Sequence, residues 1–317
     1  MKIAYLILCH RDAEHVARLA AKLTTGAPDN HVFVHVDAKS PDSAEFAVRL
    51  DGLARVSLVG PAVRVWWGGA SAIDATHRLL EASHAGGDFE RFVLLQGADY
   101  PLKSNAAIAA FFEDHRQTEF IRACNAARGR TPKVYSKGRH VLFFDAPNLL
   151  KKISNKLTRI LDLKLRDGTV RTPDGALDIH WGCAQFGLTR AAVGHLLTHP
   201  HRASLRRQFR GIFPADEIYF HTLIFNSPFA QRTMAGGAEP AITDMTEART
   251  LHYFEYPSLV RVFTADDHEL LRAREEMFVR KVSTEASSGL LDLIDAAHAC
   301  DAGRVPSDGA LAAPGAH

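Results

Sequence analysis

Strand-like and helix-like segments alternate along the first hundred residues of this chain. Apolar residues recur at helical spacing over 16–23 and 70–83. Short apolar runs typical of buried strands precede and separate them, at 3–9, 31–36, 56–59 and 92–95. This alternation predicts an α/β, Rossmann-like fold with a mostly parallel central sheet and helices on both faces. Ligands of such sheets bind beyond the carboxyl ends of the strands.

Three polar residues follow predicted strands at that edge of the sheet, namely His10, Asp37 and Asp99. For His10, a ligand contact and a hydrogen-bonded structural role are equally good interpretations. No Gly-x-Gly-x-x-Gly motif follows the first strand and no P-loop occurs, so a nicotinamide oxidoreductase is disfavoured. A nucleotide would have to be bound by side chains and strand ends.

The later part of the chain is less regular. We predict a strand over 180–188 and expect residues 301–317, rich in Gly, Ala and Pro, to be a disordered tail. Helical periodicity is predicted for 190–197, 201–209, 267–279 and 284–299. No internal repeat is present.

The overall composition excludes several functional classes. The 317 residues are 46% hydrophobic and 23% charged, with a formal charge of +2 that leaves out 17 histidines. This balance is typical of a globular protein and too weak to indicate nucleic-acid binding.

The first apolar run is too short for a membrane span or a secretory signal, so we expect a cytoplasmic protein. The histidines and cysteines lack metal-ligand spacings, and we expect no metal and no other cofactor.

Residues 151–166 have the pattern of a basic amphipathic helix, with apolar residues recurring on one face. Two interpretations remain open. The lysines form a solvated face while the apolar face covers the core, or the helix makes peripheral contact with an anionic membrane surface, which for a cytoplasmic protein is the inner face.

Two adjacent carboxylates, Asp216 and Glu217, precede an apolar helical run. The free N–H groups and the dipole of a helix start stabilise negative charge. In one interpretation Asp216 is the N-cap and Glu217 belongs to the first turn. In the other, one carboxylate caps the helix while its neighbour faces a cleft as a general base.

Six segments, taken together and in this order, resemble the core-2/I-branching N-acetylglucosaminyltransferase and peptide O-xylosyltransferase family, glycosyltransferase family 14. They are Ile3 to His10, Val34 to Ser40, Trp67 to Ser71, Leu95 to Lys103, Pro214 to Glu217 and Phe278 to Lys281. The resemblance extends over roughly residues 3–281. It implies a GT-A-like fold in a single domain over 1–300, with a nucleotide-binding half at 1–115 and an acceptor and catalytic half at 116–300.

The resemblance also implies an activity. It is the inverting transfer of N-acetylglucosamine or xylose from a UDP-sugar to a glycan or glycoconjugate hydroxyl, without a divalent metal. Glu217 would be the catalytic base. A non-catalytic protein that binds a sugar nucleotide or a glycan on the same fold is the alternative.

The donor site implied by the resemblance contains several residues of this chain. Arg280 and Lys281 would bind the diphosphate, since both side chains bind phosphate well and can replace a metal. A cationic helix end is the competing interpretation of that pair. The remaining donor contacts would be Asp99 at the sugar, Asp37 at the uridine, and His10 and Lys39 beside it. Arg261 is a further candidate for the diphosphate.

The implied acceptor side contains Trp181, Gln185 and Asp216. Gln185 stands where the family commonly has an aromatic residue, and Trp181 lies just before Gly182. Trp66 and Trp67 either stack on a base or sugar, or pack in the core.

Overall fold

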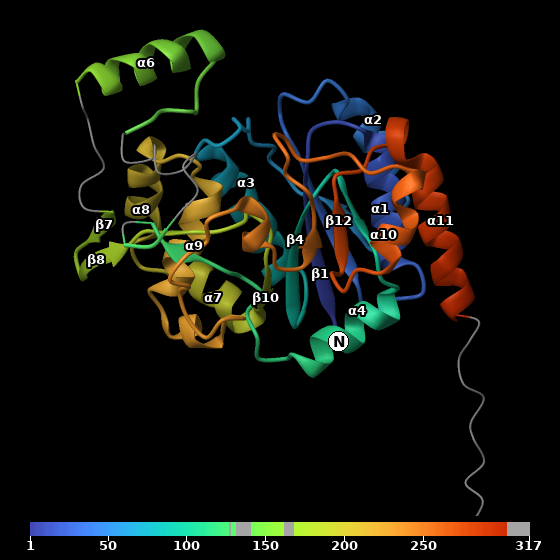
Figure 1. The fold of residues 1–317 in the computed structure, drawn as a ribbon. Helices are drawn as coiled ribbons and strands as arrows, with labels where there is room; N and C mark the ends of the chain where they lie inside the picture. The colour runs from blue at the N-terminus through green and yellow to red at the C-terminus, as the bar shows by residue number, and fades with distance from the viewer. Residues whose placement is uncertain (127, 131–140, 162–167, 303–317) are drawn as a thin grey trace, which may run out of the picture.

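The centre of the molecule is a five-stranded sheet with the order β10-β4-β1-β2-β3 (Figure 1). The computed structural model describes residues 1–126, 128–130, 141–161 and 168–302. Only β10 runs antiparallel to its neighbour, β4. The predicted α/β class with a mostly parallel sheet is therefore confirmed. The strands are β1 (Ile3–Cys9), β2 (His31–Val36), β3 (Val56–Leu58), β4 (Arg91–Gln96) and β10 (Gly187–Thr189).

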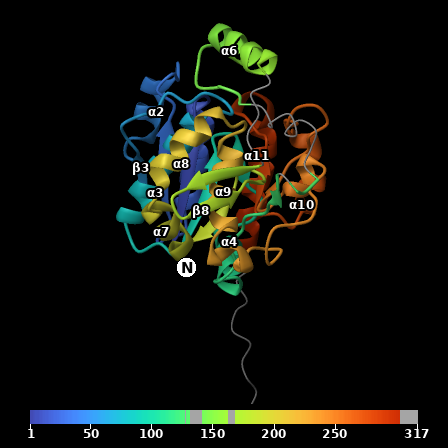
Figure 2. The same ribbon diagram turned by 90° about the vertical axis from the view of Figure 1, so that its left-hand side faces the viewer.

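Helices cover both faces of this sheet (Figure 2). Because side chains alternate along a strand, Leu6 of β1 points into one core while Tyr5 and Ile7 point into the other. The first core contains α3 (Ser71–Ala85), α7 (Arg190–Thr198), α8 (Arg202–Gln208) and α9 (Asp216–Phe225). The second contains α1 (Ala13–Thr24), α2 (Ser43–Leu50), α4 (Asn105–Asp114), α10 (His268–Arg272) and α11 (Thr284–Ala302).

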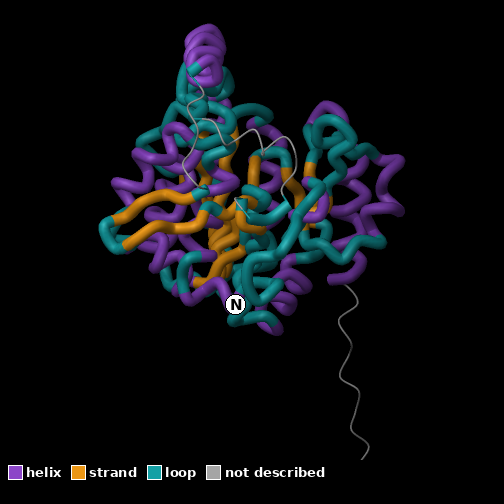
Figure 3. Tube along the Cα trace, turned by 60° about the vertical axis from the view of Figure 1, so that its left-hand side comes forward, coloured by secondary structure: helices purple, strands orange, loops and turns teal. Residues whose placement is uncertain are grey.

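A second sheet of three strands, in the order β11-β12-β5, extends the carboxyl end of β4. This sheet places two strands that follow residue 250, β11 and β12, beside β5 from the first third of the chain. Its strands are β5 (Asp99–Pro101), β11 (His252–Tyr253) and β12 (Phe278–Arg280). Two further pairs, drawn with the other strands in Figure 3, are β6 (Cys124–Asn125) with β9 (His180–Trp181) and β7 (Thr169–Thr172) with β8 (Gly175–Asp178).

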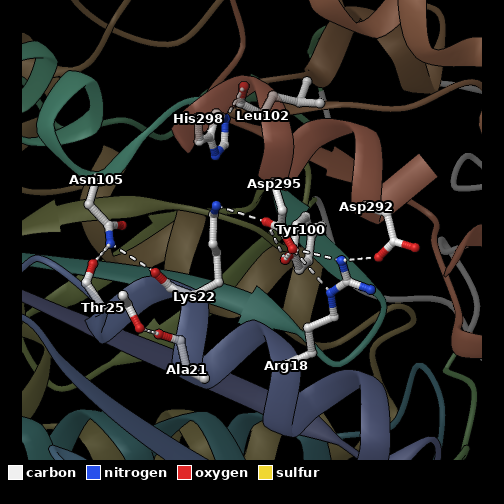
Figure 4. A network of polar contacts seen from close by, with 10 residues as sticks. All are labelled: Arg18, Ala21, Lys22, Thr25, Tyr100, Leu102, Asn105, Asp292, Asp295 and His298. Atoms are coloured by element: carbon white, nitrogen blue, oxygen red, sulfur yellow. Dashed lines mark hydrogen bonds and ion pairs between the residues drawn. The ribbon is translucent and has the colours of Figure 1, made fainter. Parts of the chain in front are cut away.

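Helix α11 is held against α1 by a network of charged side chains (Figure 4). The guanidinium of Arg18 binds Asp292 at 2.8 Å and Asp295 at 2.7 Å, and Lys22 binds Asp295 at 2.7 Å. Tyr100 of β5 donates to the same Asp295 carboxylate at 2.9 Å. The network thus joins α1, α11 and the small sheet beside the central one.

Two predicted elements were wrong. The helix expected over 267–279 ends at Arg272, because residues 278–280 leave it to pair with β5 and β11. The strand expected over 180–188 is two strands, β9 and β10. The first pairs with β6 and the second with β4, so the chain leaves one sheet and enters another between them. At that crossing a Cβ on Gly182 would lie 1.9 Å from the carbonyl oxygen of Arg122, so only glycine fits.

The expected tail lies mostly outside the described residues. Positions 301 and 302 still belong to α11, and 303–317 are not described.

The basic helix is present as α6 (Asn148–Ile160), and positions 162–166 of the predicted range lie outside the described residues. In all three ribbon and tube views it stands beyond one end of the molecule, with the N-terminus at the opposite end (Figures 1, 2 and 3). Since β1 starts at residue 3, the carboxyl ends of the parallel strands point toward the α6 end. Among the described residues, no helix combines the length and apolar character needed to cross a bilayer.

Candidate active site

The carboxyl ends of β1, β2 and β4 meet at one edge of the central sheet. The backbone N–H of Asp37 donates to Cys9 at 2.9 Å, and that of Gly97 donates to Leu8 at 2.8 Å. Asp37 then organises the following loop, because its Oδ1 accepts from the backbone N–H groups of Lys39 at 2.8 Å and Val65 at 3.1 Å.

Four of the predicted donor-site residues gather at this edge. Partial desolvation lowers the pKa of His10, and the positive charges of Lys281 and Lys39 add to that effect, while Asp37 opposes it. Lys39 lies 3.6 Å from the Asp37 carboxylate and 4.1 Å from the ring centre of Trp66. The site therefore combines one carboxylate with several cations. Whether these groups contact a nucleotide stays a prediction.

Asp99 belongs to a buried charge cluster beneath this edge. Its Oδ1 binds Arg280 at 2.7 Å, and its Oδ2 accepts from the backbone N–H of Gln96 at 2.7 Å and contacts His252 at 3.1 Å. Burial opposes ionisation, yet Arg280 and His252 hold the pKa of Asp99 below its usual range. The side chain has no exposed surface. A contact of Asp99 with the donor sugar stays a prediction, and the contacts present in the structure make Asp99 a positioning residue for Arg280.

The adjacent cations Arg280 and Lys281 have different surroundings. Arg280 is 17% exposed and binds Asp99 and, at 2.5 Å, Gln96, so it completes the buried cluster rather than facing the site. Lys281 is exposed and makes no ion pair with the residues that the structure describes. The interpretation of the pair as a helix end is also wrong, because Arg280 is the last residue of strand β12 and Lys281 follows it.

Arg261 lies directly beside Lys281. The backbone N–H of Lys281 donates to the carbonyl of Arg261 at 3.2 Å, and that of Phe263 donates to the carbonyl of Lys281 at 2.9 Å. The guanidinium of Arg261 is held by Glu255 at 2.8 Å and Asp267 at 2.5 Å. Arg261 lies twenty positions before Lys281 in the chain. Its local sequence context gave only a weak indication of a role at the diphosphate.

Glu217 lies in the first turn of α9. Its Oε2 accepts from the indole Nε1–H of Trp181 at 3.0 Å, and its carbonyl accepts from the backbone of Gly182 at 3.1 Å. Ala215 occupies the N-cap position without a side-chain cap. Asp216 is therefore not the cap that one interpretation expected, and both carboxylates face the positive end of the helix dipole.

Asp216 is half-buried. Desolvation raises the pKa of its carboxyl to about 6. A carboxyl with that pKa changes protonation close to neutral pH, which separates it from an ordinary surface aspartate. A contact with an acceptor stays a prediction.

The other two acceptor-side residues are buried. Trp181 has no exposed surface, and Gln185 is 4% exposed. The Gln185 amide oxygen accepts from the thiol of Cys183 at 2.7 Å. An acceptor contact of Trp181 and Gln185 stays a prediction, and in the structure both side chains are bound by protein groups. Trp181 orients Glu217.

The thiol of Cys183 is influenced by the charges of both Glu217 and Asp99. Burial raises the pKa of its thiol to about 12, the negative charges of Glu217 and Asp99 act in the same direction, and Arg280 opposes them. The thiol thus senses both the α9 carboxylate and the buried cluster. The two groups of site residues lie close enough to share one electrostatic environment.

The loop that contains Trp66 and Trp67 runs from β3 to α3 and contacts the start of α9. Gly68 has a φ of 70°, and a Cβ there would lie 2.3 Å from the ring of Phe213, so glycine is required. Its carbonyl accepts from Ala215 at 3.1 Å. Trp67 is 77% exposed and packs only its edge on Phe213, with 5.4 Å between ring centres. Core packing is therefore the wrong interpretation for Trp67, and its exposed ring can stack on a sugar.

Within the described ranges, no three His, Cys, Asp or Glu side chains are arranged to hold a metal ion. Lys39, Lys281 and Arg261 are among the described cations near this edge, and lysine and arginine both bind phosphate well.

Comparison with known proteins identifies the family. The family described as Core-2/I-Branching enzyme matches residues 3–239. This match covers most of the chain, and the chain belongs to that family.

Curated relatives agree with this assignment. A beta-1,3-galactosyl-O-glycosyl-glycoprotein beta-1,6-N-acetylglucosaminyltransferase of Bovine herpesvirus 4 is 25% identical over 260 residues, which cover 80% of this chain and 54% of the relative. Xylosyltransferase 2 of Canis lupus familiaris is 27% identical over 244 residues, covering 72% and 25%. The chain thus spans about half the length of the first of these relatives, and a quarter of the second.

A crystal structure of S. aureus TarS 1-349 overlaps with 78% of this chain and 62% of its own, at 12% identity. Its TM-score of 0.33 is too low to carry an argument about the fold.

Proposed function

We propose that this protein is an inverting glycosyltransferase. It moves N-acetylglucosamine or xylose from a UDP-sugar to a hydroxyl of a glycan or glycoconjugate, and it needs no divalent metal. The family membership and the names of the relatives support the sugar-transfer part of the proposal. The site residues support the mechanism.

One observation carries the mechanism, namely the Glu217 carboxylate held by the Trp181 indole at the start of α9. A general base must be ionised, fixed and accessible. The helix dipole and the indole N–H both favour the ionised form of Glu217. The carboxylate takes the proton of the acceptor hydroxyl while the hydroxyl oxygen forms a bond to the anomeric carbon. The bond from that carbon to the diphosphate oxygen breaks in the same step, which inverts the configuration.

The leaving diphosphate gains negative charge as that bond breaks. Lys281 is the exposed cation in position to stabilise it, with Lys39 and Arg261 at the same edge. Fixed cations stabilise a developing phosphate charge as a metal ion does. Asp99 acts indirectly. It binds Arg280 and so fixes the end of β12, which Lys281 follows.

The test is a measurement of UDP release from UDP-N-acetylglucosamine and from UDP-xylose, with a panel of glycan acceptors and with or without EDTA. We expect acceptor-dependent release that persists in EDTA. Loss of activity in EDTA that manganese restores would contradict metal independence. UDP binding without any release would favour the alternative, a non-catalytic sugar-nucleotide or glycan-binding protein.

A further inference from the structure

Helix α6 turns its apolar face away from the protein, whereas an ordinary surface helix turns its apolar face toward the core. Its polar side faces the protein. Thr158 is buried, Asn155 accepts a hydrogen bond from the backbone of Phe143 at 2.8 Å, and Lys151 lies 5.1 Å from the ring centre of Phe144. The polar side of the helix is thus bound by Phe143 and Phe144, which belong to the segment that leads into it.

The apolar side of α6 faces outward. A helix on a globular surface normally buries such a stripe against the core. Here six large apolar side chains are more than half exposed, and a contiguous exposed patch of this kind marks an interaction surface. They are Leu149 at 70%, Leu150 at 59%, Ile153 at 58%, Leu157 at 53%, Ile160 at 69% and, directly after the helix, Leu161 at 57%. We call them the α6 stripe.

Basic residues border the α6 stripe. Lys152 and Lys156 are exposed and lie one turn apart, so they share one edge of the stripe. With Lys151 and Phe144 they line a hollow of about 510 Å³ at the side of the helix. No acidic residue occurs between positions 148 and 161. The helix therefore combines an outward apolar face with lysines and no carboxylate of its own.

We propose that α6 binds the surface of an anionic lipid bilayer. The helix lies in the plane of the surface, with the α6 stripe among the acyl chains and the lysines at the lipid phosphates. A polar face rich in lysine opposite a leucine-rich face is the pattern of interfacial helices. A second copy of this chain would fit less well, because pairing two α6 helices through their stripes brings like charges together without an acidic partner.

The position of α6 links this surface to the candidate active site. Asp145, just before the helix, accepts from the backbone N–H of Ser71 at 3.0 Å and from its hydroxyl at 2.6 Å. Phe144 stacks on Phe213 with 4.0 Å between ring centres, four residues before Glu217. The bilayer would therefore lie at the end of the molecule where the strands end (Figure 1). The lipid-binding proposal itself does not depend on catalysis.

The experiment is sedimentation of the full chain with vesicles of phosphatidylcholine, alone or with phosphatidylglycerol. We expect binding that increases with the phosphatidylglycerol fraction and weakens with salt. Each lysine near an anionic surface contributes about fivefold in affinity, so Lys152→Gln with Lys156→Gln should weaken binding about 30-fold. Leu150→Ser, Ile153→Ser and Leu157→Ser together should abolish it, because each removes acyl-chain contact.

Matched controls come from other surfaces. Lys2→Gln with Arg116→Gln removes two exposed cations from elsewhere on the surface, and Val48→Ser with Leu293→Ser removes two exposed apolar residues from α2 and α11. Both controls should bind vesicles as the wild type does. The α6 variants should keep the wild-type melting temperature, since their side chains are mostly in solvent.

The proposal would be overturned by wild-type protein that fails to sediment with phosphatidylglycerol vesicles, or by α6 variants that bind as tightly as wild type. Wild-type dimers that the α6 variants dissociate, without any vesicle binding, would overturn it in favour of a second copy.

Discussion

Asp99 and Glu217 are two carboxylates in the same electrostatic neighbourhood, and their surroundings differ sharply. Asp99 is fully buried between Arg280, His252 and a backbone N–H. Glu217 is half-buried at a helix start, where a neutral indole donor holds one of its oxygens. A carboxylate that is paired with an arginine and accepts two further hydrogen bonds has little tendency to take a proton. A partly exposed carboxylate oriented by a neutral donor is suited to proton transfer.

Pairing and burial thus separate a structural charge from a reactive one. The same difference appears within one dipeptide, because Arg280 closes the buried cluster while Lys281 stays exposed.

The largest effect is expected at Asp99. Asp99→Asn keeps the shape of the side chain but removes the charge that neutralises Arg280. Breaking a buried ion pair in this way costs about 3–5 kcal/mol of the free energy of unfolding. Denaturant unfolding measures it. Asp88→Asn, which breaks the exposed pair with Lys2, should change stability little. An Asp99→Asn protein with wild-type stability but impaired sugar transfer would favour a direct sugar contact.

The next effect concerns Lys281. Lys281→Ala should weaken UDP binding by about 1.5–3 kcal/mol, roughly 10- to 150-fold, because a charge-assisted phosphate contact is lost. Calorimetric titration with UDP measures it, and the melting temperature of the free protein should stay near wild type. Arg280→Ala is the matched variant, and it should instead lower stability. Equal losses of UDP affinity and stability in both variants would remove the distinction between the two cations.

Trp181→Phe tests the orientation of Glu217. Removing the indole N–H takes away a hydrogen bond to the carboxylate, worth about 1.5 kcal/mol or roughly tenfold in kcat. The KM for the UDP-sugar should change little, because the diphosphate is bound elsewhere. Phe186→Leu, another fully buried aromatic of the same core, should lower the melting temperature without this kcat effect. If kcat responds equally in both variants, Trp181 has only a packing role.

The smallest effect is expected at Asp216. The pKa of its carboxyl is about 6 in the folded protein, against about 3.9 for an unfolded aspartate. The folded state then binds more protons between those values, so this stability contribution is present below pH 4 and is lost as the pH rises through about 6. Asp216→Asn cannot titrate. Its melting temperature relative to wild type should therefore be higher at pH 7.5 than at pH 4.5.

Asp266→Asn, which removes an exposed carboxylate, is the control for this pH comparison. If the Asp216→Asn difference is the same at both pH values, the raised pKa of Asp216 is refuted.

The sequence predicts the parallel core well, because apolar runs and helical spacing are local signals. It also predicts a carboxylate pair at the start of α9. It could not predict that Asp99 pairs with Arg280, since 181 positions separate them and only the pairing of β5 with β12 joins them. The sequence also does not show how exposed each side chain at the site is, because exposure depends on which distant segments pack against it.

Helix α6 illustrates a different limit. Its amphipathic period was readable, but the period does not say which face is turned toward the protein. That choice depends on Phe143 and Phe144, which bind the polar side of the helix. The interpretation in which the apolar face covers the core was therefore wrong. The membrane contact stays a proposal.

Glu217→Gln tests the claim that Glu217 is the general base. The amide keeps the shape and removes the proton acceptor. Turnover in the UDP-release assay should fall by about 10²–10⁴, with UDP affinity and melting temperature near wild type. A Glu217→Gln protein that retains more than about a tenth of wild-type turnover would contradict the claim.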